Sequence, residues 1–169
     1  IDLDPSGALT FRLGYENPRI SLADFFSGLK LNDSNIETTS ERFDFIAADS
    51  RVGNGFTGQD MKTLIEKLPK SYDLVIIDTP SDVNSSLKAA LDVADLVLVP
   101  YSNTLHQLRG VSQISKLSVD TPIKLLAVGK NSNPIKEFSQ WEHLDGSCSI
   151  AQEIEAAAHT TTSVLTYAK

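Results

Sequence analysis

Short apolar runs alternate with segments of helical spacing along most of this chain. Each run is rich in Val, Ile, Leu or Phe and is bounded by turn residues or a charge. Runs that are apolar on both faces are typical of strands in a parallel sheet that is covered on both sides. The pattern predicts strands at residues 43–48, 72–78, 94–101 and 123–129.

The segments between these runs have the spacing of amphipathic helices. They are residues 21–29, 58–68, 85–93 and 104–117. In the second segment the apolar residues fall at i, i+3, i+4 and i+7, on one face of a helix. Strands and helices that alternate in this way are joined by right-handed crossovers. We therefore predict an α/β fold with an open, mostly parallel sheet and helices on both faces.

Composition limits the classes of protein that need to be considered. A chain of 169 residues is long enough for one domain with a sizeable core. No apolar run approaches the ~18 residues that a membrane helix needs, so no membrane association is evident. A net charge of −7 without a Lys/Arg cluster argues against strong nucleic-acid binding by this stretch alone. The single cysteine, Cys148, excludes an internal disulfide framework and fits the reducing cytoplasm.

Carboxylates stand where three of the predicted strands end. Asp2 and Asp4 stand where a buried strand is predicted to end at the start of the chain. Asp49 follows the predicted strand 43–48, and Asp78 ends the predicted strand 72–78. Ligands of such sheets bind beyond the carboxyl ends of the strands. Packing does not require a carboxylate there, because burying an unpaired charge costs several kcal/mol. For Asp2 and Asp49, capping of the following turn is the alternative interpretation.

Asp78 is the acid for which a capping role fits least. It ends the apolar residues 74–77 and is followed by Thr79 and Pro80. A proline forces the residue before it into an extended conformation, which directs the Asp78 carboxylate out of the sheet edge. Mg²⁺ can be held there, directly or through water.

Four stretches resemble motifs of the ParA/MinD family of deviant P-loop ATPases, and they occur along the chain in the order that the family has. YDLVIIDTP, a helix and then ADLVLVPY resemble the Walker B region of the family, and IDLDPSGALT resembles its D-x-D-P-Q-G-N-x-T/S motif. FDFIAADS is similar to the third strand of the family, and SIAQEIEAAAHTTTSVLTYAK to its late strand and loop. The resemblance covers nearly the whole chain and implies one ParA-like ATPase domain over residues 1–169.

The phosphate-binding loop of this family is missing from the sequence. In the family a strand, K-G-G-x-G-K-T and a helix precede the D-x-D-P strand, and the loop wraps phosphates with backbone N–H groups. No G-x-x-x-x-G-K-[ST] occurs here, and GNGFTG at 53–58 lacks the lysine. The C-terminal helix of the family is not found either. We expect the chain to be the core of a longer ATPase, truncated at both ends; the alternative is a degenerate, non-hydrolysing scaffold.

The resemblance implies roles for the strand-end acids. Asp4 matches the catalytic carboxylate that positions the water attacking the γ-phosphate, a reaction controlled by positioning and charge. Asp78 matches the Walker B acid, which contacts Mg²⁺ through water. Asp2 matches a position nearer the Mg²⁺ and its water shell.

Other positions are implied to contact the nucleotide. Gly7 would keep the loop after the first strand close to ATP, and residues 79–84 correspond to a segment that senses the γ-phosphate. Base recognition in the family uses residues after the later strands, for which Lys130 and Asn131 are the candidates here.

As a family member, the protein would be a cytoplasmic, nucleoid-associated ATPase of a bacterium or archaeon that partitions plasmid or chromosomal DNA. ATP would join two copies into a homodimer, and hydrolysis to ADP and phosphate would release them. The implied partners are nonspecific DNA and a ParB-like adaptor that binds a centromere-like site. A MinD-like role in positioning cell division is the alternative within the family.

Receiver domains of phosphorelay systems are an alternative from another class. Asp2 with Asp4, Asp78 and Lys130 could take the roles of their acidic pair, phospho-accepting aspartate and lysine. The spacing between Asp4 and Asp78 is too long for a receiver, and D-P-x-G has no place in that pattern. The ATPase interpretation is therefore favoured.

Overall fold

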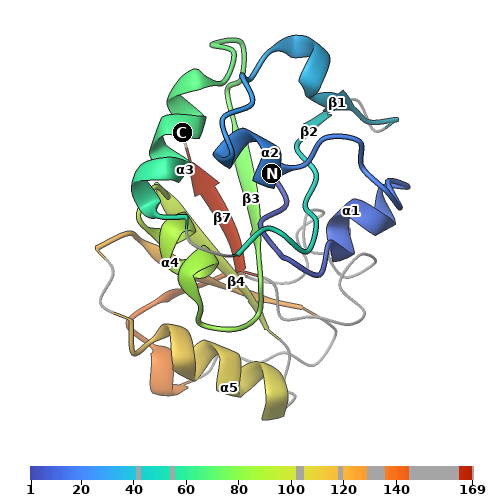
Figure 1. Ribbon diagram of the computed structural model, residues 1–169. Coiled ribbons are helices and arrows are strands. Elements are labelled where there is room, and N and C mark those ends of the chain that lie inside the picture. The colour runs from blue at the N-terminus through green and yellow to red at the C-terminus, as the bar shows by residue number, and fades with distance from the viewer. Residues whose placement is uncertain are drawn as a thin grey trace.

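The computed structural model describes residues 1–40, 43–53, 56–101, 105–117, 120–128, 136–144 and 164–168. Among these residues, five strands form one sheet in the order β3-β7-β4-β5-β6, and two strands form a separate hairpin (Figure 1). The strands are β1 (Glu37–Thr38), β2 (Asp44–Phe45), β3 (Val75–Thr79), β4 (Leu96–Tyr101), β5 (Ile123–Ala127), β6 (Glu142–Leu144) and β7 (Val164–Ala168). The α-helices are α1 (Ala8–Arg12), α2 (Leu22–Phe26), α3 (Gly58–Lys67), α4 (Ser85–Leu91) and α5 (Leu105–Ile114). The 3-10 helices are η1 (Asp33–Asn35) and η2 (Lys136–Phe138).

Four of the helices form where the apolar spacing predicts them, and two begin with a capping box. Ser21 and Asp24 satisfy each other's backbone N–H groups at the start of α2, and Thr57 and Asp60 do so at the start of α3. Helix α3 ends two residues before Pro69, which cannot continue a helix. No helix among the described residues is long and apolar enough to cross a membrane.

The large sheet is mostly parallel, as predicted, with one antiparallel strand. Strands β4, β5 and β6 pair in parallel, whereas β7 pairs antiparallel with both β3 and β4. Because β7 is antiparallel to both neighbours, β3 and β4 run in the same direction on either side of it. The α/β fold class is therefore confirmed. Strand β7 lies in the stretch that resembles the family's late strand and loop, most of which lies outside the described residues.

The run at 43–48 forms less strand than its composition predicts. Only its residues in β2 have strand conformation, and they pair antiparallel with β1 outside the large sheet. The Ala47 carbonyl instead accepts a hydrogen bond from the Leu22 N–H at the start of α2. The Ala48 N–H donates to the Thr10 hydroxyl. These two hydrogen bonds occupy backbone groups that would have to pair with a neighbouring strand if β2 were longer.

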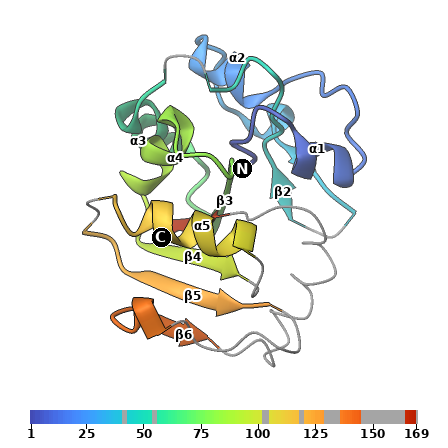
Figure 2. The same ribbon diagram turned by 90° about the horizontal axis from the view of Figure 1, so that it is seen from below.

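The core consists of two clusters of buried apolar side chains. One joins the N-terminal segment to α2, α3 and β3 and includes Leu3, Leu22, Met61 and Ile77. The other lies between α5 and the sheet, where α5 packs across β4 (Figure 2), and includes Val97, Val99, Val111 and Leu125.

Strand β3 is less covered than the prediction of a sheet buried on both faces requires. Leu74 is 43% exposed and Ile76 is 50% exposed. Both line an apolar cavity of about 480 Å³, whose walls also include Ile1, Phe43 and Phe45. The apolar run 72–78 therefore faces the core with alternate residues only, while Leu74 and Ile76 border this cavity.

Candidate functional site

The backbone segments that carry Asp2 and Asp78 are direct neighbours. The two residues form a parallel β-bridge. The Leu3 N–H donates to the Asp78 carbonyl over 2.8 Å, and the Asp78 N–H donates to the Ile1 carbonyl over 2.9 Å. Asp2, which forms this bridge outside the named strands, therefore lies beside Asp78 near the end of β3, as the parallel arrangement predicts.

The Asp78 carboxyl group lies in a site that disfavours its charged form. Its pKa is raised to about 7, mainly by burial and then by the negative charges of Asp2 and Asp4, and partly offset by the Ile1 amino group and Arg12. No described residue donates a hydrogen bond to this carboxylate. A divalent cation would relieve the repulsion among the acids. The chemistry of these oxygen donors therefore fits Mg²⁺.

Asp2 is fully buried, and protein donors engage both of its carboxylate oxygens. Oδ1 accepts the Asp4 N–H over 3.0 Å. Oδ2 accepts the Thr10 N–H over 2.9 Å and the Thr10 hydroxyl over 2.7 Å. Burial raises the pKa of Asp2, and these hydrogen bonds act in the opposite direction. Asp2 thus ties the turn after the first segment to helix α1.

Asp4 lies at the start of that turn and is partly exposed. Its Oδ1 accepts the Ser6 N–H over 2.8 Å, and its carbonyl accepts the Gly7 N–H over 2.9 Å. Its second carboxylate oxygen accepts no hydrogen bond from the residues that the structure describes. A carboxylate that is fixed through one oxygen can use its other oxygen to orient a water molecule.

Gly7 connects this turn to α1 in a conformation that suits glycine. Its φ is +61°, in the left-handed region. A Cβ placed on it would lie 3.5 Å from the Ala48 carbonyl oxygen. The backbone at Gly7 therefore lies close to Ala48, in the segment after β2.

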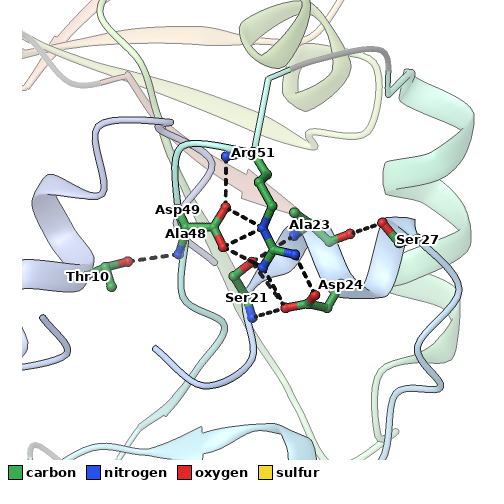
Figure 3. Close-up of polar contacts among 8 residues, drawn as sticks. All are labelled: Thr10, Ser21, Ala23, Asp24, Ser27, Ala48, Asp49 and Arg51. Carbon is green, nitrogen blue, oxygen red and sulfur yellow. Dashed lines mark hydrogen bonds and ion pairs between the residues drawn. The ribbon is translucent and has the colours of Figure 1, made fainter. Parts of the chain in front are cut away.

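The Asp49 carboxylate caps the turn that follows it, which agrees with the capping role given above as the alternative to ligand binding. Its Oδ1 accepts the Arg51 N–H over 2.8 Å. The Arg51 guanidinium also pairs with Asp49 and, over 2.8 Å, with Asp24 of the α2 capping box (Figure 3). The hydrogen bond from Arg51 lowers the pKa of Asp24. This clamp was missed from the sequence because Asp24 and Arg51 are 27 residues apart.

Some of the predicted site residues lie close together in the structure, and two others are not among the residues that it describes. Asp2, Asp4, Asp78 and Gly7 meet at one edge, whereas Lys130 and Asn131 lie outside the described residues. Within the described ranges, no group of three or more His, Cys, Asp or Glu side chains could hold a metal ion by itself.

Residues 1–123 match the model of a family described as AAA domain (AAA_31), which covers more than half of the chain. The chain belongs to this family, as a ParA/MinD-like deviant Walker ATPase. It is 25% identical over 127 residues to the sporulation initiation inhibitor protein Soj of Bacillus subtilis (strain 168), covering 68% of this chain and 49% of Soj. It is 23% identical over 66 residues to a ParA family protein of Mycoplasma pneumoniae, covering 39% of this chain and 24% of that protein.

The fold of this ParA-like chain is also found in a solved structure. The crystal structure of a plasmid partition protein from Borrelia burgdorferi matches it with a TM-score of 0.69 and 18% sequence identity. The match covers 91% of this chain and 80% of the plasmid partition protein. Among the sequence relatives, the ParA-like chain spans about half the length of Soj and about a quarter of the Mycoplasma pneumoniae protein.

Proposed function

We propose that the protein acts as an ATP-dependent partition ATPase that hydrolyses ATP to ADP and phosphate. The observation that carries the proposal is the convergence of Asp2, Asp4 and Asp78 at neighbouring strand ends of a ParA-like fold. Acids placed there repel one another, and Mg²⁺ with a bound triphosphate would balance their charge.

Each residue of the site has a proposed part in the reaction. Asp4 accepts a hydrogen bond from the attacking water and aligns it with the γ-phosphate, which its partly exposed carboxylate permits. Asp78 contacts the Mg²⁺ through water, and the metal supplies charge stabilisation for the transferring phosphoryl group. Gly7 lets the loop backbone approach the nucleotide, and Lys130 and Asn131 are proposed to contact the base.

We propose that Asp2 lies near the Mg²⁺ but does not bind it directly. Three protein donors engage its two oxygens. We therefore assign it to the surroundings of the Mg²⁺ and its water shell, where its negative charge adds to the attraction for the cation.

The reaction would drive a cycle of assembly. ATP joins two copies face to face, and hydrolysis releases them. The dimer binds nonspecific DNA on the nucleoid, and a ParB-like adaptor bound to a centromere-like site stimulates turnover. These partners are proposed on the strength of the relationship to Soj and the fold shared with a plasmid partition protein.

Substitution of Asp4 tests the function. In the whole protein, Asp4→Ala should leave ATP binding intact and abolish turnover, because only the positioning of water is lost. Binding is measured by calorimetry and turnover by phosphate release, with Asp73→Ala on the exposed approach to β3 as the control. Undiminished hydrolysis in Asp4→Ala would refute the catalytic assignment. Binding without turnover in the unaltered protein would favour the non-hydrolysing scaffold.

A further inference from the structure

Thr10 is a buried polar residue of α1. It ends the stretch that resembles the D-x-D-P-Q-G-N-x-T/S motif, but no role was predicted for it from the sequence. Its side chain belongs to a residue that is only 2% exposed. Its hydroxyl donates to Asp2 Oδ2 over 2.7 Å and accepts the Ala48 N–H over 2.9 Å; Figure 3 shows the latter bond. Its own N–H donates to the same Asp2 oxygen over 2.9 Å. The hydroxyl therefore uses its donor and an acceptor site at once.

These bonds join two neighbouring segments near the N-terminus, eight residues apart, to a third segment that is distant in the sequence. Ala48 lies 38 residues from Thr10 and belongs to the segment after β2. Asp2 belongs to the segment beside β3, and its second oxygen holds the Asp4 N–H over 3.0 Å. The position of Asp4 is thereby linked through Asp2 to Thr10, and through Thr10 to Ala48 in the segment after β2.

Packing alone does not account for this arrangement. A buried carboxylate carries a desolvation cost that an apolar pair of the same shape would avoid. The cost is offset here by three donors: the Asp4 N–H belongs to the turn, and the two Thr10 donors tie Asp2 to α1. A catalytic carboxylate needs such support, because a shift of about 1 Å can reduce a rate ~100-fold.

We propose that Thr10 is a positioning residue, which acts through Asp2 to hold Asp4 in place for hydrolysis. The inference rests on the proposed function, since Asp4 has a role to be positioned for only if the protein turns over ATP.

Two substitutions at Thr10 separate the hydroxyl from the shape of the side chain. Thr10→Val removes the hydroxyl and keeps the shape, whereas Thr10→Ser keeps the hydroxyl. In the whole protein, Thr10→Val should lower kcat for ATP by about 10- to 100-fold with KM within about twofold, and Thr10→Ser should restore most of kcat. Thr63→Val is the matched control, because the Thr63 hydroxyl bonds only to Gln59 within α3: it donates to the Gln59 carbonyl and accepts from the Gln59 side-chain amide. It should leave kcat unchanged.

A second variant and a second readout keep the inference testable if Thr10→Val folds poorly. In Asp2→Asn the amide oxygen can still accept both Thr10 donors, but the NH₂ group then faces the Asp4 N–H. We expect the same loss of kcat. Hydrogen exchange measured by NMR on this 169-residue chain should show faster exchange of the Asp4 N–H in both Thr10→Val and Asp2→Asn, beyond any change in global stability.

The outcomes distinguish this inference from the proposed function. Absence of turnover in the unaltered protein overturns the proposed function. Normal turnover that Thr10→Val and Asp2→Asn leave unchanged overturns the positioning role alone. A loss of kcat that Thr10→Ser shares in full, with unchanged exchange at Asp4, also overturns it, because the hydroxyl would then have no part.

Discussion

At the residue scale, the charge of Asp78 opposes the stability of the fold, at the position where we propose that it contacts Mg²⁺. Its carboxyl group is partly buried near the end of β3, and its pKa is raised to about 7 by burial and by Asp2 and Asp4. In the absence of a cation, ionisation of Asp78 therefore opposes folding. A site that gains stability by binding Mg²⁺ is expected to show this behaviour.

Substitution of Asp78 should stabilise the metal-free chain in a pH-dependent way. The pKa of an aspartate in an unfolded chain is about 3.9, and in the folded protein that of Asp78 is about 7. The stability contributed by its protonation is complete below pH ~4 and is lost as pH rises through about 7. The urea midpoint of Asp78→Asn should therefore be higher than that of the unaltered chain. This difference between the midpoints should be largest at pH 8 and should become smaller towards pH 5.

Both midpoints are measured with a chelator present, and Asp73→Asn at an exposed position controls for the change in net charge. A difference between Asp78→Asn and the unaltered chain that is the same at both pH values would contradict the assignment. In the whole protein, Asp78→Asn should also weaken Mg²⁺-dependent ATP binding.

At the scale of elements, close contacts between helix ends set the positions of the loops. The start of α3 packs against the end of α4. A Cβ placed on Gly58 would lie 2.6 Å from the Asp92 Cβ and 2.9 Å from its Cγ. This separation leaves no room for a side chain at the first residue of α3. Glycine is therefore needed there for the approach of two helices and not for its backbone conformation.

Replacement of Gly58 should destabilise the fold although alanine is the better helix former. In a free helix, Gly→Ala stabilises by about 1 kcal/mol. Here Gly58→Ala should lower the free energy of unfolding by about 1–3 kcal/mol, because the new methyl group overpacks the α3–α4 contact. Urea denaturation measures the change.

Gln59→Ala, at the exposed next position of α3, is the control and should be nearly neutral. The double variant Gly58→Ala with Asp92→Ala should recover part of the loss, because the Asp92 carboxyl group no longer occupies the space. An increase in stability for Gly58→Ala alone would show that the two helices separate without cost.

At the scale of the whole molecule, the described residues include the acids that we propose to act at a nucleotide site, but the sequence contains no phosphate-binding loop motif. The acids meet beside β3, and G-x-x-x-x-G-K-[ST] does not occur in the sequence. Phosphate-binding loops contribute most of the backbone donors to the phosphates. A chain with the acids and without this loop should interact weakly with ATP.

Calorimetry on the 169-residue chain tests this expectation. We expect no tight binding of ATP, with or without Mg²⁺, because the remaining acids repel the triphosphate when no loop donors are present. Dissociation in the micromolar range would mean that the phosphates are held by residues other than those assigned. ADP in the same titration is the matched control for binding through the base and ribose.

Much of the fold could be predicted from local patterns. Helix α3 follows from its apolar spacing and its capping box, and β3, β4 and β5 follow from apolar runs between turns. The meeting of Asp2 with Asp78 follows from parallel strands ending at a common edge. Helix α1 has only five residues and no apolar period, so no pattern predicted it. The outward exposure of Leu74 and Ile76 was not predicted either, because a run of apolar residues does not tell which face is covered.

The sequence by itself determined the α/β class, the order of its main elements and the strand-end position of the acids, because each depends on residues that are close along the chain. Only the tertiary structure decided which groups pair. It placed Thr10 between Asp2 and Ala48, joined Arg51 to Asp24, and put β7 antiparallel between β3 and β4. A hydroxyl, a guanidinium or a strand edge has many chemically equivalent partners, and only folding in three dimensions selects among them.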